Sequence, residues 1–202
     1  MSDRPAARWL PREPGNVRGR ATANRLALAA LEVAERHGVE ATTIDEICHV
    51  ASCSRRTFFH HFPSREAALL GSAVPIVKAE SVARYLAEPI PILTGAIDLV
   101  DIPEEMSPSS PLGARRYALL RVSPQLQAAA RERMTPAASA VLAAVTKKIA
   151  QLPGIDRDET RLIAEAVTTM AAGLIQSAYS DGTNNPSKTL DLLAPIWHQL
   201  IS

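Results

Sequence analysis

The sequence predicts an all-α protein in which a small N-terminal three-helix domain precedes a longer helical part. Composition is the first reason: 47% of the 202 residues are apolar but only 4% are aromatic, and alanine and leucine, both strong helix formers, dominate the apolar set. Periodicity is the second reason, because apolar residues recur at helical spacing and alternating runs of valine, isoleucine and threonine are missing.

The same composition limits the classes of protein to which the chain can belong. No run reaches the roughly 18 apolar residues that cross a bilayer, and no apolar stretch follows the first arginines as it would in a secretion signal. Cys48 and Cys53 are the only cysteines and lie five positions apart, which is not typical of a disulfide-built secreted domain. We therefore expect a cytoplasmic protein that does not bind a membrane.

The first ordered element is expected to begin near Thr22. Residues 1–21 are rich in arginine, proline and glycine without hydrophobic periodicity, which is typical of a flexible basic arm. Apolar residues then recur at helical spacing until Gly38, a residue suited to the left-handed position just past a helix end. These are Leu26, Ala30, Val33 and Ala34. A first helix is therefore predicted between Thr22 and Gly38.

Two short helices are expected next. Thr43 stands three residues before Glu46 at the head of an apolar run, so that a hydroxyl and a carboxylate can cap a helix start reciprocally. This helix is expected to end near Ala51, and Ser54 can cap a third helix. Two such helices, joined by a short turn and preceded by a supporting helix, form the helix-turn-helix scaffold that lays its last helix in the major groove of DNA. We assign residues 22–70 to this domain.

A longer signature runs across these helices. It comprises Ala41-Thr42-Thr43-Ile44, Ile47 and the run Ala51-Ser52-Cys53-Ser54-Arg55-Arg56-Thr57-Phe58-Phe59-His60-His61-Phe62-Pro63-Ser64-Arg65-Glu66-Ala67-Ala68-Leu69. From Arg25 to Leu69 the chain resembles the DNA-binding domain of the TetR family in residue type, order and spacing, without a gap. The resemblance implies a sequence-specific regulator of transcription and, by the habit of the family, a repressor that a small-molecule effector releases from DNA. The remaining two thirds of the chain match only in helical character.

The front of the third helix carries side chains suited to reading bases. An arginine is long and planar enough to bond O6 and N7 of guanine together. We expect Arg55, Arg56 and Thr57 to make the base contacts. The resemblance adds five residues at the DNA surface, of which the first three are expected to contact phosphates. They are Thr43, His61, Arg65, Phe59 and His60.

The N-terminal arm offers a further contact with DNA. Arg18 and Arg20 lie just before the first helix. Narrow minor grooves in A·T tracts attract arginine, so these two side chains are expected to enter a minor groove beside the one that the third helix reads.

Three positions depart from the pattern of the family. Ser52 stands where the family usually has a glycine in the turn, and Phe59 where it often has a tyrosine whose hydroxyl reaches a phosphate. Ala34 stands where a bulky aromatic often fills the core, so that Phe58 or Phe62 has to compensate. We expect the departures to affect the affinity for DNA rather than the fold.

Residues 71–202 are predicted to form a helical domain for effector binding and dimerisation. A fourth helix is expected from Ala67 to about Ala87, kinked at Pro75. Further helices are expected near residues 92–100, 112–122 and 124–151, with a loop over residues 101–111.

The last two helices are expected at residues 158–180 and 187–201. Their apolar stripes, which include Leu162, Ile163, Leu174, Leu190, Leu193, Trp197 and Leu200, are broad enough for more than one neighbour. The resemblance implies that both helices pair with those of a second copy in a four-helix homodimer interface. A twofold dimer can read a palindromic operator, because its symmetry repeats the contacts and fixes the spacing of the half-sites. The alternative is that both helices complete a monomeric core.

The resemblance also implies a cavity for an unknown small-molecule effector among the central helices. Flexible or amphipathic side chains suit the lining of such a pocket. The candidates are Tyr85, Met106, Tyr117, Met134 and Met170, each of which could equally be an ordinary core residue. No set of charged residues stands out among them, which favours an apolar or amphipathic effector.

Other classes of function find less support in the sequence. The chain has no nucleophile elbow, glycine-rich phosphate loop or zinc-protease motif, so we expect neither an enzyme nor a cofactor. The spacing of Cys48, Cys53, His60 and His61 argues against a metal site, since consecutive histidines on a helix point about 100° apart. The remaining alternative is a helical ligand carrier or interaction module without specific DNA binding.

Overall fold

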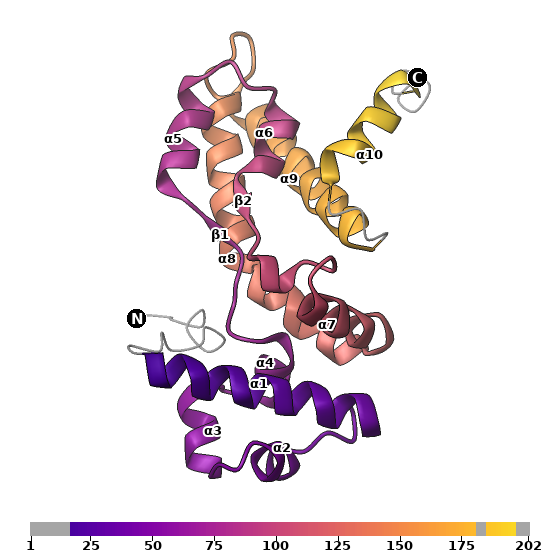
Figure 1. Ribbon diagram of the computed structural model, residues 1–202. Coiled ribbons are helices and arrows are strands. Elements are labelled where there is room, and N and C mark those ends of the chain that lie inside the picture. The colour runs from indigo at the N-terminus through magenta and orange to yellow at the C-terminus, as the bar shows by residue number, and fades with distance from the viewer. Residues whose placement is uncertain (1–16, 181–184, 197–202) are drawn as a thin grey trace. The chain divides into compact units, whose positions relative to one another are not determined.

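The computed structural model of the protein describes residues 17–180 and 185–196 and confirms the all-α prediction (Figure 1). Its α-helices are α1 (Val17–His37), α2 (Ile44–Val50), α3 (Arg55–His61), α4 (Arg65–Leu70), α5 (Ala79–Ala87), α6 (Ile92–Asp98), α7 (Pro111–Val122), α8 (Pro124–Ile149), α9 (Arg157–Ser180) and α10 (Pro186–Leu193). Short 3₁₀ helices span Glu104–Met106 and Ala194–Ile196, and the strands β1 (Ile76–Val77) and β2 (Val100–Asp101) form one antiparallel pair. The end of the predicted last helix, residues 197–201, lies outside the described residues, as do residues 1–16 of the predicted arm.

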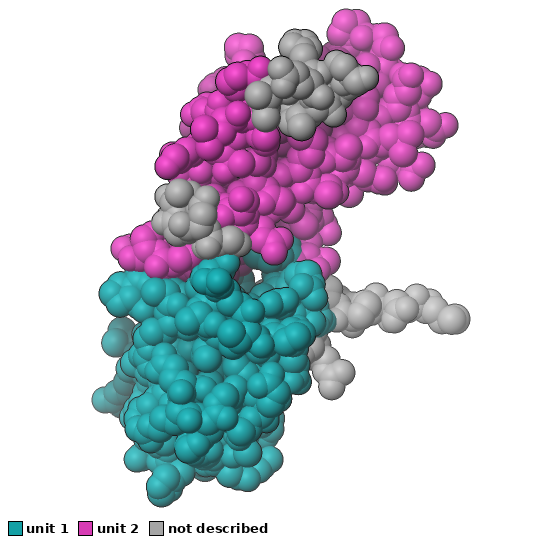
Figure 2. Space-filling view, turned by 90° about the vertical axis from the view of Figure 1, so that its right-hand side faces the viewer, with its two compact units in different colours: residues 1–74, 110–134 teal, residues 75–109, 135–202 magenta. Residues whose placement is uncertain are grey.

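The chain folds into two compact units, shown in different colours in Figure 2. The N-terminal unit comprises residues 1–74 and 110–134, and the C-terminal unit comprises residues 75–109 and 135–202. The sequence alone places residues 110–134 in the C-terminal part, whereas the structure groups them with the three N-terminal helices. The division within α8 falls beside Pro136.

Contacts between α7 and α1 explain why residues 110–134 belong to the N-terminal unit. Leu119 and Leu126 are buried in the same apolar cluster as the inner face of α1. The Nε and Nη2 groups of Arg115 donate to the two carboxylate oxygens of Glu35, both at 2.7 Å. These hydrogen bonds lower the pKa of the Glu35 carboxyl, so the pair stays charged at neutral pH.

Helix α1 begins at Val17, so the predicted start near Thr22 is wrong by five residues. Arg18 and Arg20 therefore lie on the first turns of a helix, where both are exposed, and not in a flexible arm. These turns have no apolar stripe because their side chains are not packed in a core. Once a helix has been nucleated by packing further along, however, adding residues at its end costs little.

The core of the N-terminal unit is built from the predicted faces of its first three helices. Ile47, Phe58 and Phe62 are almost fully buried, in the same apolar cluster as the inner face of α1 and Ala34. Both phenylalanines are thus available to compensate for the small Ala34, as expected. Both hydroxyl caps are confirmed: Thr43 Oγ1 accepts from Glu46 N at 3.2 Å, and Ser54 Oγ accepts from Thr57 N at 3.1 Å. The Glu46 carboxylate, predicted to cap in return, instead lies 3.1 Å from His37 Nε2.

The predicted continuous helix from Ala67 to Ala87 is wrong, since the structure has two helices in this stretch. Helix α4 ends at Gly71, whose φ of +79° is a left-handed conformation that favours glycine. A Cβ at this position would overlap the guanidinium of Arg116. Chain direction therefore changes at Gly71, and the segment runs through Pro75 and β1 before α5 begins at Ala79.

The C-terminal unit has its own apolar core between α5, α6, α8 and α9. Tyr85 of α5 is 1% exposed, and its ring lies so close to Gly95 of α6 that a Cβ there would be 2.5 Å from the ring. Helix α6 packs on α9, and α10 packs on α9 as well (Figure 1). Among the described residues, no helix has both the length and the apolar character that a transmembrane segment requires.

Candidate nucleic-acid interface

The turn between α2 and α3 fixes where the third helix points. Its backbone closes with two hydrogen bonds, from Cys53 N to Cys48 O (3.0 Å) and from Ser52 N to His49 O (3.1 Å), which together form a Schellman motif. Ser52 takes the left-handed position of this motif with a φ of +49°. A glycine adopts that conformation without strain, so Ser52 keeps the geometry of the turn at some energetic cost.

The two cysteines serve this turn as packing groups. Cys48 and Cys53 are joined by the outer hydrogen bond of the Schellman motif, and the side chains at these two positions usually contact each other. Both cysteines belong to the apolar cluster of the N-terminal unit. Burial, reinforced by the neighbouring Cys53 thiol, raises the pKa of Cys48 to about 11. Cys48 is therefore a protonated thiol at neutral pH, and neither cysteine forms a disulfide.

Helix α3 presents one buried and one exposed face. Phe58 points into the core, while Arg56, Phe59 and His60 are exposed. Together with the half-buried Thr57, these exposed side chains line a hollow of about 440 Å³ on the surface. We call the four residues Arg56, Thr57, Phe59 and His60 the reading face. The exposure of Arg56, Phe59 and His60 follows from the inward position of Phe58. Residues one or two positions away from it on the helix point about 100° or 200° away from the core.

Arg55 is also exposed but is held by two neighbours. Its Nη1 group donates to both Asp45 carboxylate oxygens at 2.8 Å. Its guanidinium carbon lies 5.9 Å from the centre of the Phe59 ring, within the range of a cation–π contact. Asp45 lies on α2, so this ion pair links the two helices of the helix-turn-helix.

Residues 26–70 match the bacterial regulatory proteins of the tetR family, and this match spans most of α1 and all of α2, α3 and α4. This segment is a DNA-binding domain of the tetR type. The chain is therefore a DNA-binding regulator of transcription, with a helix-turn-helix in its N-terminal unit. No curated protein matches the chain.

The environment of Arg65 in the folded protein differs from the one that the sequence suggests. Its side chain is only 22% exposed. Nη1 donates to the carbonyl oxygens of Glu40 (2.9 Å) and Thr42 (2.8 Å), Nη2 donates to Gln125 Oε1 (3.0 Å), and Nε donates to Glu66 Oε1 (2.7 Å). Four of its five N–H groups are thus used inside the protein. This geometry favours a role in holding the loop before α2 over the predicted phosphate contact, which stays untested.

Arg65→Lys is expected to lower the free energy of unfolding by about 1–3 kcal/mol, because one ammonium cannot satisfy the acceptors that the guanidinium bonds in four directions. Chemical denaturation measures this loss. Arg36→Lys is the matched control, since Arg36 is an exposed arginine on α1 that pairs with Glu32 one helical turn away. The alternative result is unchanged stability together with a weaker dependence of DNA binding on salt, in which the slope of log K against log salt concentration falls by about one. That result would make Arg65 a phosphate contact.

The environment of His61 at the end of α3 makes stability depend on pH. Burial, together with the charge of His60, lowers the pKa of His61. The unfolded chain then binds more protons than the folded one below the ordinary histidine pKa of about 6.5. Stability therefore falls as the pH drops from 7 toward 5.

His61→Gln is expected to lose less stability than the wild type between pH 7 and pH 5, because the substitution removes the group whose protonation favours unfolding. Thermal unfolding at several pH values tests this. His49→Gln, at an exposed position on α2, controls for the loss of any histidine. Equal acid sensitivity of wild type and His61→Gln would rule out His61 as the cause.

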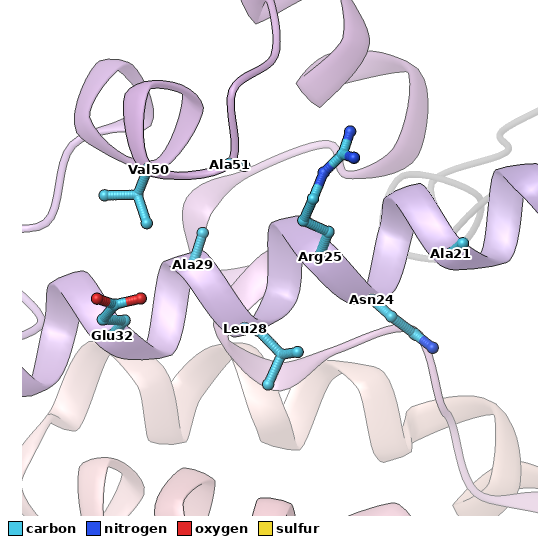
Figure 3. A pocket seen from close by; sticks show the side chains of 8 residues that line it. All are labelled: Ala21, Asn24, Arg25, Leu28, Ala29, Glu32, Val50 and Ala51. Atoms are coloured by element: carbon cyan, nitrogen blue, oxygen red, sulfur yellow. The ribbon is translucent and has the colours of Figure 1, made fainter.

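A second hollow lies beside α1, on the side where α2 ends (Figure 3). Its volume is about 340 Å³. The lining residues are Ala21, Asn24, Arg25, Leu28, Ala29, Glu32, Val50 and Ala51. Figure 3 shows Arg25 extending from α1 on the same side as Val50 and Ala51. The lining is largely small and apolar, and only Leu28 adds a large exposed apolar side chain.

The five residues predicted to line the effector pocket do not share one unit. Tyr117 and Met134 belong to the N-terminal unit, and Tyr85, Met106 and Met170 belong to the C-terminal unit. The hydroxyl of Tyr85 donates to the carbonyl oxygen of Ile92 at 3.0 Å. Burial raises the pKa of this hydroxyl to about 12. Tyr85 therefore packs as a core residue here, and its predicted role in effector binding remains a prediction.

Proposed function

We propose that this TetR-family regulator is a homodimeric repressor that binds a palindromic operator through α3 and leaves it when a small molecule binds. The reading face carries this proposal. Arg56, Thr57, Phe59 and His60 line one exposed hollow on a helix whose opposite side is anchored by the fully buried Phe58. A helix that is fixed on one side and exposes an arginine, a hydroxyl and an aromatic ring on the other is suited to the major groove.

Three side chains of the reading face have a chemical partner in the groove. The Arg56 guanidinium can bond O6 and N7 of a guanine, and the Thr57 hydroxyl can donate or accept. The exposed ring of Phe59 suits the methyl group of a thymine, where a tyrosine hydroxyl would have reached a phosphate. Thr43 is exposed beside α2, so its proposed phosphate contact shares the hydroxyl that caps this helix.

We further propose that α9 and α10 form the dimer interface. Both helices leave large apolar side chains exposed, namely Leu162 and Ile163 on α9 and Leu192 on α10. Side chains of this kind are normally covered when they cluster. A twofold axis through this interface gives two copies of α3, as a palindromic operator requires.

The effector is proposed to act by shifting a population. A small molecule that binds better to the DNA-free arrangement of the dimer must weaken DNA binding by the same coupling free energy, typically about 1–3 kcal/mol. The side chains that bind the effector are proposed to lie among the central helices, as in the predicted set.

The proposal is tested by selecting random duplex DNA with the purified protein and by sedimentation of the free protein. Enrichment of one palindromic sequence by a protein that sediments as a dimer supports the repressor. If no sequence is enriched and binding stays weaker than about 10⁻⁶ M at physiological salt, the DNA-reading proposal fails. A helical carrier or interaction module then becomes the better description.

A further inference from the structure

The ion pair between Asp45 and Arg55 cannot be explained by stability. Both side chains are well exposed, 70% and 58% respectively, and an exposed pair in water contributes little to the folding free energy. Asp45 also places a negative charge next to a surface that has to approach phosphates, which weakens DNA binding in general. An acidic residue in the first turn of α2 interacts favourably with the helix dipole, but this interaction does not require a pair with Arg55. The pairing therefore needs another explanation.

The geometry of the pair leaves one edge of the arginine available. Nη1 of Arg55 uses its two N–H groups on the two Asp45 oxygens, at 2.8 Å each. Within residues 17–180 and 185–196, Nε and Nη2 of Arg55 have no hydrogen-bond acceptor. These two groups present parallel N–H bonds, and that spacing matches O6 and N7 of guanine.

Phe59 restrains the same guanidinium from another side. It lies one helical turn after Arg55, and its ring centre is 5.9 Å from the guanidinium carbon. The ring of Phe59 in turn packs edge-on against the buried Phe58, with 5.5 Å between the ring centres and 87° between the planes. Asp45 and Phe59 thus restrict the rotamers of Arg55 before DNA binds.

We propose that Asp45 is a positioning residue for specificity, which together with Phe59 presents the Nε–Nη2 edge of Arg55 to one guanine in each half-site. This inference rests on the proposed function and adds a residue that does not itself touch a base. A held arginine loses less conformational entropy on binding and tolerates fewer alternative partners. Asp45 therefore lowers the general affinity for DNA while it raises discrimination between bases.

The two effects have opposite signs, so they can be separated by experiment. A duplex selected by the wild-type protein is compared with duplexes that carry single base-pair changes and with a scrambled duplex. Asp45→Ala is expected to bind the scrambled duplex more tightly than wild type does. At one base pair of each half-site, its discrimination is expected to fall about fivefold or more.

Two further variants make the test specific. Glu46→Ala removes an acidic residue from the same first turn of α2, but Glu46 contacts His37 and not Arg55, so discrimination should stay as in wild type. Arg55→Lys keeps the positive charge but loses the planar fork. Its discrimination is expected to fall roughly tenfold, at the same base pair at which Asp45→Ala loses discrimination. Circular dichroism confirms that each variant is folded, and Asp45→Asn takes the place of Asp45→Ala if the alanine variant does not fold.

The possible results separate this inference from the proposed function. The inference is supported if Asp45→Ala and Arg55→Lys lose discrimination at the same base pair while Glu46→Ala keeps it. The positioning role is overturned if Arg55→Lys loses discrimination at a base pair where Asp45→Ala keeps it, or if neither variant changes any base preference. In both of these cases the repressor proposal stands. If the wild-type protein selects no sequence, the proposed function fails and this inference falls with it.

Discussion

Replacing Arg56 by alanine is expected to reduce the affinity for the selected operator by about tenfold or more and to relax the preference at one base pair in each half-site. Arg56 is exposed on the reading face, and the described residues offer it no ion pair, so its full fork is available to a guanine. A good bidentate contact contributes about 1–3 kcal/mol of discrimination, and a dimer makes it twice. Fluorescence anisotropy with matched and single-substituted duplexes measures both effects.

Arg121→Ala provides the control for this substitution, because Arg121 is an exposed arginine on α7 and lies outside the reading face. The control should lose no discrimination. An Arg56→Ala variant that weakens binding to operator and scrambled duplex by the same factor would make Arg56 a phosphate contact, and base reading would then depend on Arg55 and Thr57.

The second large effect is expected for Phe58→Ala, which should lower the free energy of unfolding by about 3–5 kcal/mol. Phe58 is fully buried and packs with Phe62 and the inner face of α1. Its removal leaves a cavity at the one point where α3 is anchored to the core. Urea denaturation measures the loss, and DNA binding should weaken with it because α3 is no longer held in place.

Phe59→Ala is the matched control, since the two phenylalanines are neighbours in sequence but Phe59 is 49% exposed. It should change stability by much less than Phe58→Ala and act mainly on DNA binding. Equal destabilisation by the two substitutions would contradict the orientation of α3 described above and, with it, the definition of the reading face.

Local signals explain why so much of the DNA-binding domain could be predicted from the sequence. The caps at Thr43 and Ser54 and the glycine at Gly38 act on the residues next to them, so their effects do not depend on the rest of the fold. The resemblance carried by the signature from Ala41 to Leu69 then predicts which residues face DNA. Of these, Arg55, Arg56, Phe59 and His60 on α3 are exposed, whereas Thr57 and His61 are half-buried. Their contacts with DNA stay predictions.

The errors of the prediction come from packing, which sequence periodicity does not report. The first turns of α1 lack an apolar stripe, so periodicity predicts a start at Thr22 instead of Val17. The break after α4 has no sequence signal because Gly71 and the buried Arg116 meet only in the folded chain. In the same way, four hydrogen-bond acceptors around Arg65 come from three separate segments and gave no signal in the sequence.

Asp45 is the residue with a proposed role in DNA binding that sequence reasoning missed. It stands ten positions before Arg55, and acidic residues in the first turn of a helix are common because they interact with the helix dipole. Only the angle at which α2 and α3 cross brings the carboxylate to the guanidinium. An acidic residue on the second helix facing an arginine at the start of the third is the pattern to look for in other helix-turn-helix sequences.

The central claim, that α3 reads DNA sequence, is tested most directly by one ratio: the dissociation constant for a scrambled duplex divided by that for the selected duplex, measured by anisotropy at physiological salt. The account predicts a ratio of about 10³ or more, the usual range for specific regulators, together with a steep loss of affinity as salt rises. A ratio near one, with both duplexes bound weakly, would contradict it.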